Sequence, residues 1–222
     1  MKEAVLSKDP FLTLISKIKA KRKRLISYKS LVLAVNGLPK CGSTTFSKKL
    51  CKTLEKDGMK TVLVQVNDFQ LPYQMRYSPN LSEPKNYYKN NFNFLMIFEK
   101  LVKPSKTEKD YSIDLPIFNT FAESYDTRKK FYFPKNTVLI IEGPFLLQKS
   151  FLKNFDYSVF LKISEEESIK RFNATETAIF GKEVYQNFEK IYKPAQEIYF
   201  KEQNPEQNAK MVIENETLQN FS

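Results

Sequence analysis

LVLAVNGLPKCGSTT, residues 31–45, is the stretch that decides the fold of this chain. It begins as an uninterrupted apolar run, which is typical of a strand buried on both faces of a parallel sheet. Gly37 and Gly42 follow with the spacing G-x-x-x-x-G, and the residues from Ser43 onward have the apolar spacing of a helix start. We therefore expect a strand, a glycine turn and a helix N-terminus, whose free amides and dipole together favour a phosphate group.

The turn departs at one position from a phosphate-binding loop. Such loops carry Lys directly after the second glycine, where it reaches the β- and γ-phosphates, and this chain has Ser43 there. Thr44 keeps the hydroxyl that holds Mg²⁺ in such loops. Lys40 lies inside the turn, and its ammonium could approach the phosphates from another direction. The alternative is an ordinary strand-to-helix turn that contains two glycines.

The composition limits the chemistry. A chain of 222 residues with 41% hydrophobic content can bury one sizeable core, so we expect one domain. His is absent, which excludes His-based triads, His metal sites and a His general base within the chain and leaves proton transfer to carboxylates, Lys or Tyr. Cys41 and Cys51 match neither a metal-site spacing nor a disulfide scaffold, which indicates a reducing compartment.

The net positive charge indicates an anionic partner but does not identify its chemical class. The net charge of +11 suits nucleotide phosphates, nucleic acid or an acidic protein surface, and a genome of biased composition, which gives lysine-rich chains, would produce it as well. Residues 17–24 concentrate the basic side chains, either as a solvated helix face or as a site for a protein or nucleic-acid partner. No apolar run approaches about 18 residues and the first residues lack a secretory apolar region, so we expect a cytoplasmic protein without membrane association, with an organellar matrix left open.

The remaining periodic segments predict an alternation of helices and strands. Polar side chains follow two of the strands, namely Asp68 with Asn67 after the second and Glu142 after the third. Because ligand sites lie beyond the carboxyl ends of parallel strands, we expect these residues to face the same crevice as the glycine turn. Glu142 there can serve a magnesium site, or it can simply cap a helix. The predicted strands are 31–35, 61–66, 138–141, 157–163 and 211–213, and the predicted helices are 10–18, 43–57, 93–102, one beginning after Ser164, and 185–199 with an interruption at Pro194.

Several motifs, in the right order, resemble the uridine kinase and pantothenate kinase group of phosphate-loop kinases over residues 31–213. GLPKCGSTT (37–45) is similar to the family loop G-x-x-x-x-G-K-[ST]-T, and VQVNDFQ (64–70) to the family strand that ends in D-D-F-Y or D-G-F. LPIFN (115–119) is similar to P-x-Y-[DN], VLIIEGPFLL (138–147) to V-I-I-E-G-x-x-L, and YKPAQEIYFKEQNPEQNAKMVI (192–213) to the family's C-terminal piece that ends in A-D-x-x-I.

The resemblance implies a phosphate-loop fold, with a three-layer α/β arrangement in which helices flank a parallel sheet. It also implies ATP and Mg²⁺ as cofactors. The implied phosphate-binding residues are Gly37, Lys40, Cys41, Gly42, Ser43, Thr44 and Thr45, the metal-site residues are Thr44 and Glu142, and the catalytic residues are Asp68, Lys40 and Arg171. Asn67 stands where the family has its base, and an amide cannot accept that proton, so Asp68 would have to act in its place.

Two functions stay open at this point. The first is an ATP-dependent small-molecule kinase that phosphorylates a hydroxyl, with a nucleoside as the expected acceptor and pantothenate and glycerate as alternatives. Loss of the loop lysine and of the base would leave it slow or inactive. The second is a catalytically degenerate, kinase-like protein that binds nucleotide or serves as a structural subunit of a larger complex. We expect residues 1–30 to form a basic helical extension and residues 31–222 a single domain, with substrate and lid insertions near 70–135 and 170–195.

Overall fold

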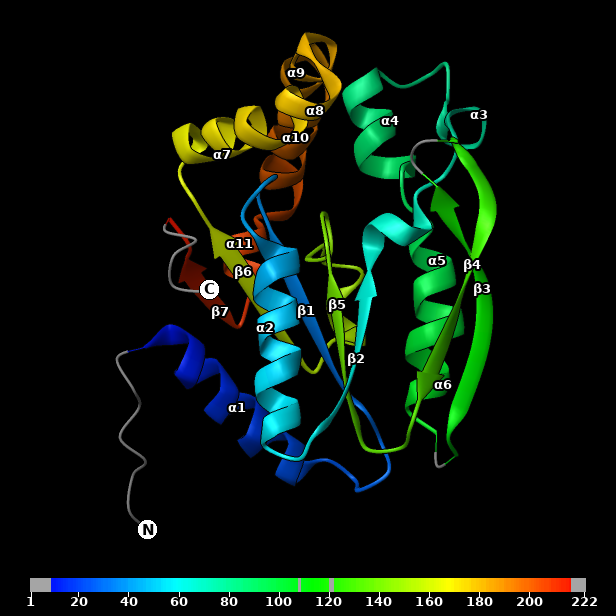
Figure 1. Ribbon diagram of the computed structural model, residues 1–222, viewed down its shortest axis with the longest axis vertical. Helices are drawn as coiled ribbons and strands as arrows, with labels where there is room; N and C mark the ends of the chain where they lie inside the picture. Colours follow the sequence, from blue (N-terminus) through cyan, green and yellow to red (C-terminus); the bar gives the residue numbers. More distant parts are fainter. Residues whose placement is uncertain (1–8, 108, 120–121, 217–222) are drawn as a thin grey trace.

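The computed structural model describes residues 9–107, 109–119 and 122–216 of the chain. Its main sheet has the strand order β2-β5-β1-β6-β7, and every neighbouring pair of strands is parallel. The strands are β1 (Leu31–Gly37), β2 (Lys60–Gln65), β5 (Thr137–Glu142), β6 (Tyr157–Lys162) and β7 (Met211–Glu214). The predicted α/β class with a parallel sheet between helices is confirmed (Figure 1).

Alternate residues of the central strand β1 enter two different apolar cores, one on each face of the sheet. Leu31, Leu33 and Val35 pack with helices α1 (Pro10–Arg24) and α2 (Ser43–Lys56). Val32 and Ala34 pack on the opposite face, in the cluster that includes side chains of α4 (Glu83–Asn90) and α10 (Lys193–Gln203). All seven residues of β1 are buried, which is why the strand reads as a continuous apolar run rather than an alternation.

Strands β1 and β2 follow each other in the sequence but are not neighbours in the sheet. The β1-α2-β2 unit forms as predicted, but β5 lies between its two strands and pairs with both of them. The carboxyl ends of β1, β2 and β5 therefore lie side by side. The register sets Val35 opposite Glu142 on one side of β5 and Gln65 opposite Glu142 on the other.

The segment between β2 and β5 holds more structure than its polar composition predicts. One helix was expected, at residues 93–102; the structure has a helix there that runs through α5 (Phe94–Met96), η2 (Ile97–Val102) and α6 (Lys103–Ser105). The antiparallel hairpin of β3 (Tyr111–Asn119) and β4 (Ser124–Phe133) was missed. Pro116 lies within β3 and lacks a backbone donor, which is tolerated because, among the described residues, β3 pairs with β4 alone. The short elements η1 (Val66–Phe69) and α3 (Tyr73–Arg76) complete the segment, together with α4.

The C-terminal part is mostly helical and rises above the sheet (Figure 1). Ser164 caps α7 (Glu165–Phe172) as predicted, since its hydroxyl accepts a bond from the amide of Glu167. The expected interruption at Pro194 is a wide helical turn, η5 (Phe188–Tyr192), directly before α10, which is how the helix accommodates a proline that lacks a donor. The other elements are η3 (Leu152–Asn154), η4 (Asn173–Thr177), α8 (Ala178–Phe180), α9 (Lys182–Asn187) and α11 (Pro205–Asn208).

Helix α1 matches its prediction, with Asp9 accepting a bond from the Phe11 amide at 2.8 Å. Its apolar face is buried in the same core as α2 and β1. None of the helices in the described ranges combines the length and apolar character that a bilayer crossing requires.

Candidate functional site

The residues after β1 form a loop whose carbonyl groups are held from one side. Each of three consecutive carbonyls accepts a hydrogen bond from a side chain of α7 or of the segment after β7. The bonds run from Ser168 Oγ to Pro39 O at 2.7 Å, from Arg171 Nη1 to Lys40 O at 3.3 Å, and from Asn215 Nδ2 to Cys41 O. Because a trans peptide points its N–H away from its C=O, the amides of residues 40–42 point away from these side chains.

The N-terminus of α2 is left uncapped beside this loop. Its N-cap is Gly42, which has no side chain to accept a bond from the first-turn amides, and no side-chain cap is formed. Gly42 has φ +83°, a left-handed conformation that costs other L-residues energy. The first-turn amides and the positive end of the dipole are therefore free to meet an anion, and Thr45 in this first turn is exposed.

The absence of a side chain at Gly37 allows Cys41 and the backbone of β6 to pack closely against the start of the loop. A Cβ at this position would lie 2.5 Å from Cys41 Sγ and 2.5 Å from Leu161 O. The Cys41 side chain is thus packed beneath the loop, and its burial raises the pKa of the thiol to about 12. Neither a thiolate nor a disulfide is formed here, since both Cys41 and Cys51 are free and buried.

Glu142 binds the two hydroxyl residues that open α2. Its carboxylate accepts bonds from Ser43 Oγ at 2.7 Å and from Thr44 Oγ1 at 2.9 Å, and a third from Gln65 Nε2 at 3.0 Å. It does not cap a helix, because its partners at α2 are hydroxyls rather than amides. The Thr44 hydroxyl and the Glu142 carboxylate thus lie together, a pair of oxygen ligands that suits Mg²⁺.

The structure gives Lys40 a partner outside the loop. Its ammonium forms an ion pair with Glu176 of η4 and lies 5.7 Å from the centre of the Phe172 ring. Lys40 itself has φ +59°, an uncommon conformation for a residue with a side chain. Neither Lys40 nor Phe46 plugs the loop: the ammonium is held by Glu176, and Phe46 is fully buried against Phe11 in the core.

The Arg171 side chain bonds to Glu167 and to backbone carbonyl groups. Its side chain is 8% exposed, and its guanidinium donates to Glu167 at 2.7 Å. The same group also reaches the carbonyls of Lys40, Asn215 and Glu216. These contacts tie the loop to α7 and to the chain after β7, and they differ from the direct role at the phosphates that the resemblance implied.

Asp68 and Asn67 lie in η1, at the end of β2. Asn67 is exposed, whereas Asp68 forms an ion pair with Lys129 of β4 at 2.7 Å. Lys129 comes from the hairpin that the sequence did not predict, so this partner was missed. At the end of β1, Asn36 donates a hydrogen bond to Gly143 O at 2.9 Å and accepts one from the Tyr199 hydroxyl at 2.7 Å.

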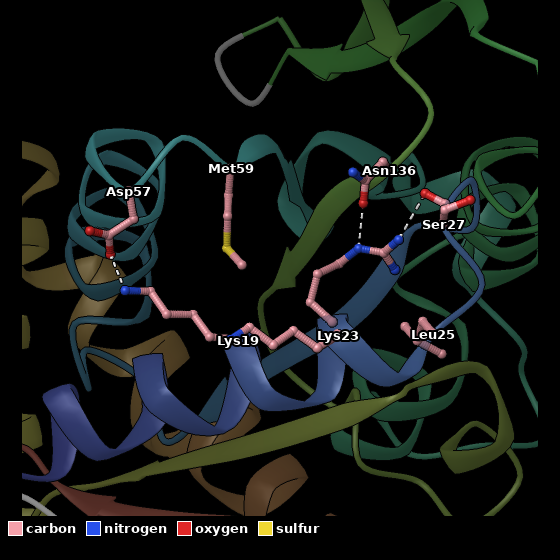
Figure 2. Close-up of a pocket in the computed structure, with 8 residues that line it drawn as sticks. Lys19, Lys23, Leu25, Ser27, Asp57, Met59 and Asn136 are labelled. Carbon is pink, nitrogen blue, oxygen red and sulfur yellow. Dashed lines mark hydrogen bonds and ion pairs between the residues drawn. The ribbon is translucent and has the colours of Figure 1, made fainter. Parts of the chain in front are cut away.

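A hollow of about 540 Å³ lies at the other end of the strands (Figure 2). Met59 and Asn136, which line it, directly precede β2 and β5, so it opens at the amino ends of the strands and is separate from the loop. Two cations of the basic run already have partners there: Lys19 pairs with Asp57 at 2.8 Å and Arg22 bonds Asn136.

Solved structures with a similar fold include proteins described as kinases or candidate kinases. A protein described as a candidate uridine kinase from Bacillus stearothermophilus is 22% identical, with a TM-score of 0.66, covering 90% of this chain and 98% of its own. A candidate fructose transport system kinase from Silicibacter sp. TM1040 is 16% identical, with a TM-score of 0.71 and coverage of 91% and 98%. The D-glycerate 3-kinase of Cryptococcus neoformans is 12% identical, with a TM-score of 0.65 and coverage of 96% and 98%.

The fold is that of a phosphate-loop kinase. No family model and no curated protein sequence matches the chain. The phosphate-loop kinase fold covers nearly the whole chain, as the motif order indicated, while the low identities leave the acceptor open.

Three residues that hold this loop or Glu142 in place escaped the sequence analysis. Ser168 and Asn215 hold loop carbonyls, and Gln65 holds Glu142. Only Gln65 carried a signal, because it lies at the end of a predicted strand. Ser168 and Asn215 lie 129 and 174 residues from their partners, a distance over which a local pattern carries no information.

Proposed function

We propose that this protein is an ATP-dependent kinase that transfers the γ-phosphoryl group to a hydroxyl of a small molecule, with a nucleoside as the acceptor. The observation that carries the proposal is the loop after β1, whose carbonyls are tied back while the first turn of α2 stays uncapped beside the Thr44–Glu142 pair. Such a loop is pre-organised for a polyphosphate even without a lysine. The nucleoside rests on the motif resemblance, and glycerate or pantothenate are the next candidates.

The residues present fit a nucleotide and a divalent ion. The amides of Lys40 and of residues 42–45 would hold the phosphates, whereas the Cys41 amide already donates to Leu38 O at 3.0 Å. Thr44 and Glu142 would hold Mg²⁺, with phosphate oxygens as further ligands, since no cluster of three Cys, Asp or Glu residues suited to a metal occurs within the described ranges. When bound, Mg²⁺ supplies neutralisation of the charge on the β- and γ-phosphates.

Asp68 is the proposed acceptor of the hydroxyl proton. The acceptor oxygen bonds to the γ-phosphorus, its proton passes to the Asp68 carboxylate, and the bond to the β-phosphate oxygen breaks so that ADP leaves with the electron pair. Lys129 orients Asp68 through their ion pair of 2.7 Å. Lys40 would serve the phosphates after leaving Glu176, and Arg171 acts as a positioning residue for the loop.

Calorimetry with Mg²⁺ and ATP tests the proposal. Binding at millimolar ATP or tighter is expected, and Thr44→Ala should weaken it because a metal ligand is lost. Thr53→Ala, on the same helix but away from the loop, is the matched control and should bind like the wild type. The absence of binding heat with both ATP and GTP would overturn the kinase proposal.

A degenerate, kinase-like subunit is the second candidate, and particular residues favour it. Ser43 and Asn67 replace two groups on which catalysis depends in the resembling family, and both Lys40 and Arg171 are engaged elsewhere. Ser43→Lys separates the candidates: in a slow enzyme the restored charge should raise product formation about 10²-fold or more with the accepted nucleoside. If neither form phosphorylates any member of a nucleoside panel, the subunit reading is preferred.

A further inference from the structure

The hollow at the amino ends of the strands is built by segments that are far apart in the sequence. They are the end of α1 with the residues after it, the turn between α2 and β2, and the residue before β5 (Figure 2). The residues that line it are Lys19, Arg22, Lys23, Leu25, Ser27, Asp57, Met59 and Asn136. Its volume of about 540 Å³ lies in the range of small-molecule sites, about 300–1,000 Å³, so the hollow has room for a small ligand.

The hollow has a surplus of positive charge. Three cations line it, whereas Asp57 is the one acid among the described residues that do so, which leaves a net charge of +2. Asp57 is already paired with Lys19 at 2.8 Å, and Lys23 is exposed and forms no ion pair within the described ranges. Outside the lining, the charge of Asp156 acts on Arg22, but this carboxylate also serves Lys106 at 3.7 Å and the amide of β1 at 2.8 Å. A ligand with two negative charges would balance the surplus.

Arg22 holds one nitrogen for which the chain supplies no acceptor. Its Nε donates to the side chain of Asn136, and its Nη2 donates to Ile26 O at 3.1 Å and to Ser27 O at 2.9 Å. These bonds fix the guanidinium, while Nη1 is buried and has no hydrogen-bond partner among the described residues. A buried donor without an acceptor is costly. Because Arg22 lines the hollow, an anion bound there would supply this acceptor after a small movement of the side chain.

The other lining residues indicate what kind of anion fits. Leu25 and Met59 offer apolar surface beside the cations. A phosphate monoester carries about −1.5 to −2 charges at pH 7 and has three acceptor oxygens, and the group that it esterifies can be apolar. No aromatic ring is among the described residues that line the hollow, whereas proteins hold single-stranded nucleic acid by stacking its bases on such rings. The lining therefore suits a small molecule better than a nucleic acid.

We propose that this hollow is a second ligand site, which binds a small phosphate monoester. Its phosphate group contacts Arg22 and Lys23, and its apolar part packs against Met59. Lys19 also reaches the phosphate without releasing Asp57, because an ammonium group has three donors. The site lies at the opposite end of the strands from the loop after β1, so the inference does not depend on nucleotide binding at that loop.

Methyl NMR of the full chain tests the site, with phenyl phosphate as the probe. The chain has five methionines, and Met59 is the one that lines the hollow within the described ranges. Its methyl resonance, assigned with Met59→Leu, should shift in a saturable way during a titration at constant ionic strength. The resonances of Met75 in α3 and Met211 in β7 should stay in place. Phenol, which lacks the phosphate group, should not shift the Met59 resonance.

Two lysines of α1 give a matched pair of variants. Both Lys17 and Lys23 are exposed, but only Lys23 lines the hollow. Lys23→Gln should weaken the affinity for phenyl phosphate about fivefold, and Lys23→Glu should weaken it further, while Lys17→Gln should bind like the wild type. Thr44→Ala, which alters the proposed nucleotide site, should also keep the wild-type affinity. Loss of ATP binding in calorimetry and loss of the Met59 shift thus report on the two proposals separately.

The inference is overturned by any of the following results. The Met59 resonance does not shift in a saturable way, or Thr44→Ala abolishes the shift, which would place the probe at the loop. Lys17→Gln weakens binding as much as Lys23→Gln, which would indicate a diffuse charge effect, or Lys23→Glu binds as tightly as the wild type. A single-stranded oligonucleotide shifts the Met59 resonance at a lower phosphate concentration than phenyl phosphate does, which would assign the basic end of α1 to nucleic acid instead.

Discussion

Gly42 joins two functions of the loop at a single residue. Its positive φ turns the chain into α2, and its missing side chain leaves the helix amides uncapped. The neighbouring carbonyls are fixed by side chains of α7 and of the segment after β7, so the loop is shaped by contacts on its outer side. A substitution at residue 42 is therefore expected to have two effects: it should lower the stability of the fold and weaken the proposed binding of nucleotide.

Gly42→Ala should lower the free energy of unfolding by roughly 1–2 kcal/mol, because alanine is strained at this φ. It should also weaken the proposed binding of the Mg²⁺–nucleotide complex, because relief of the strain at this φ would shift the first-turn amides of α2. Gly58→Ala is the matched control: its φ is +77°, nothing lies within 4 Å of an added Cβ, and it ends the same helix. We expect a similar loss of stability with unchanged nucleotide affinity, measured by urea unfolding and calorimetry. Equal affinities in both variants would contradict the role of Gly42.

Cys41 should make the stability sensitive to alkaline pH. Burial raises the pKa of its thiol from 9.0 to about 12, so between these values the folded chain keeps a proton that the unfolded chain loses. Stability is unaffected below pH 9 and falls as the pH rises above it, by up to about 1.4 kcal/mol per pH unit. Cys41→Ser should show a shallower decline in the free energy of unfolding, measured with urea between about pH 9 and 11. Parallel profiles for the two proteins would rule this out.

At the scale of elements, one ion pair links the loop after β1 to the helices above it. Glu176 belongs to η4, which continues α7, and it holds the Lys40 side chain that is 27% exposed. In the proposed function, phosphates bound to the loop would compete with Glu176 for the Lys40 ammonium. Nucleotide binding and the position of η4 are therefore coupled in the proposed function.

Glu176→Gln should strengthen nucleotide binding. Freeing Lys40 removes a partly exposed ion pair worth up to about 1 kcal/mol, which corresponds to a gain in affinity of up to about fivefold. Glu166→Gln is the control, since Glu166 is exposed on α7 and has no ion pair within the described residues. The affinity for Mg²⁺–ATP is compared by calorimetry. A weaker affinity in Glu176→Gln than in Glu166→Gln would show that the pair supports binding instead.

At the scale of the whole molecule, α1 shares its apolar core with the elements that carry the loop. Leu14 and Ile18 are fully buried beside α2 and the central strand β1. The division at residue 30, made from the charge pattern, stays a prediction about domain organisation. The packing makes it testable, because an independent extension would not change the unfolding of the rest.

Leu14→Ala should destabilise the whole domain in one transition, by about 2–5 kcal/mol, because it opens a cavity in the core beneath α2. Leu12→Ala is the control: Leu12 lies on the same helix but is 49% exposed, so its loss should change stability by no more than about 0.5 kcal/mol. Urea unfolding followed by circular dichroism measures both. An unchanged midpoint in Leu14→Ala would mean that α1 unfolds separately.

The sequence by itself determined the parts of this protein that depend on neighbouring residues. The apolar runs of β1, β5 and β6, the glycine turn, the start of α2 and the Ser164 cap all follow from local spacing and conformational preference. Motif order indicated the phosphate-loop fold, and the position after a buried strand singled out Glu142.

Only the tertiary structure decided which groups meet. It placed β5 between β1 and β2, built the hairpin that brings Lys129 to Asp68, and turned Lys40 toward Glu176. It also brought Ser168 and Asn215 within hydrogen-bonding distance of carbonyl groups in the loop. The physical reason is that each of these contacts joins residues far apart in the chain, and such pairs form only after whole faces of helices and strands have packed.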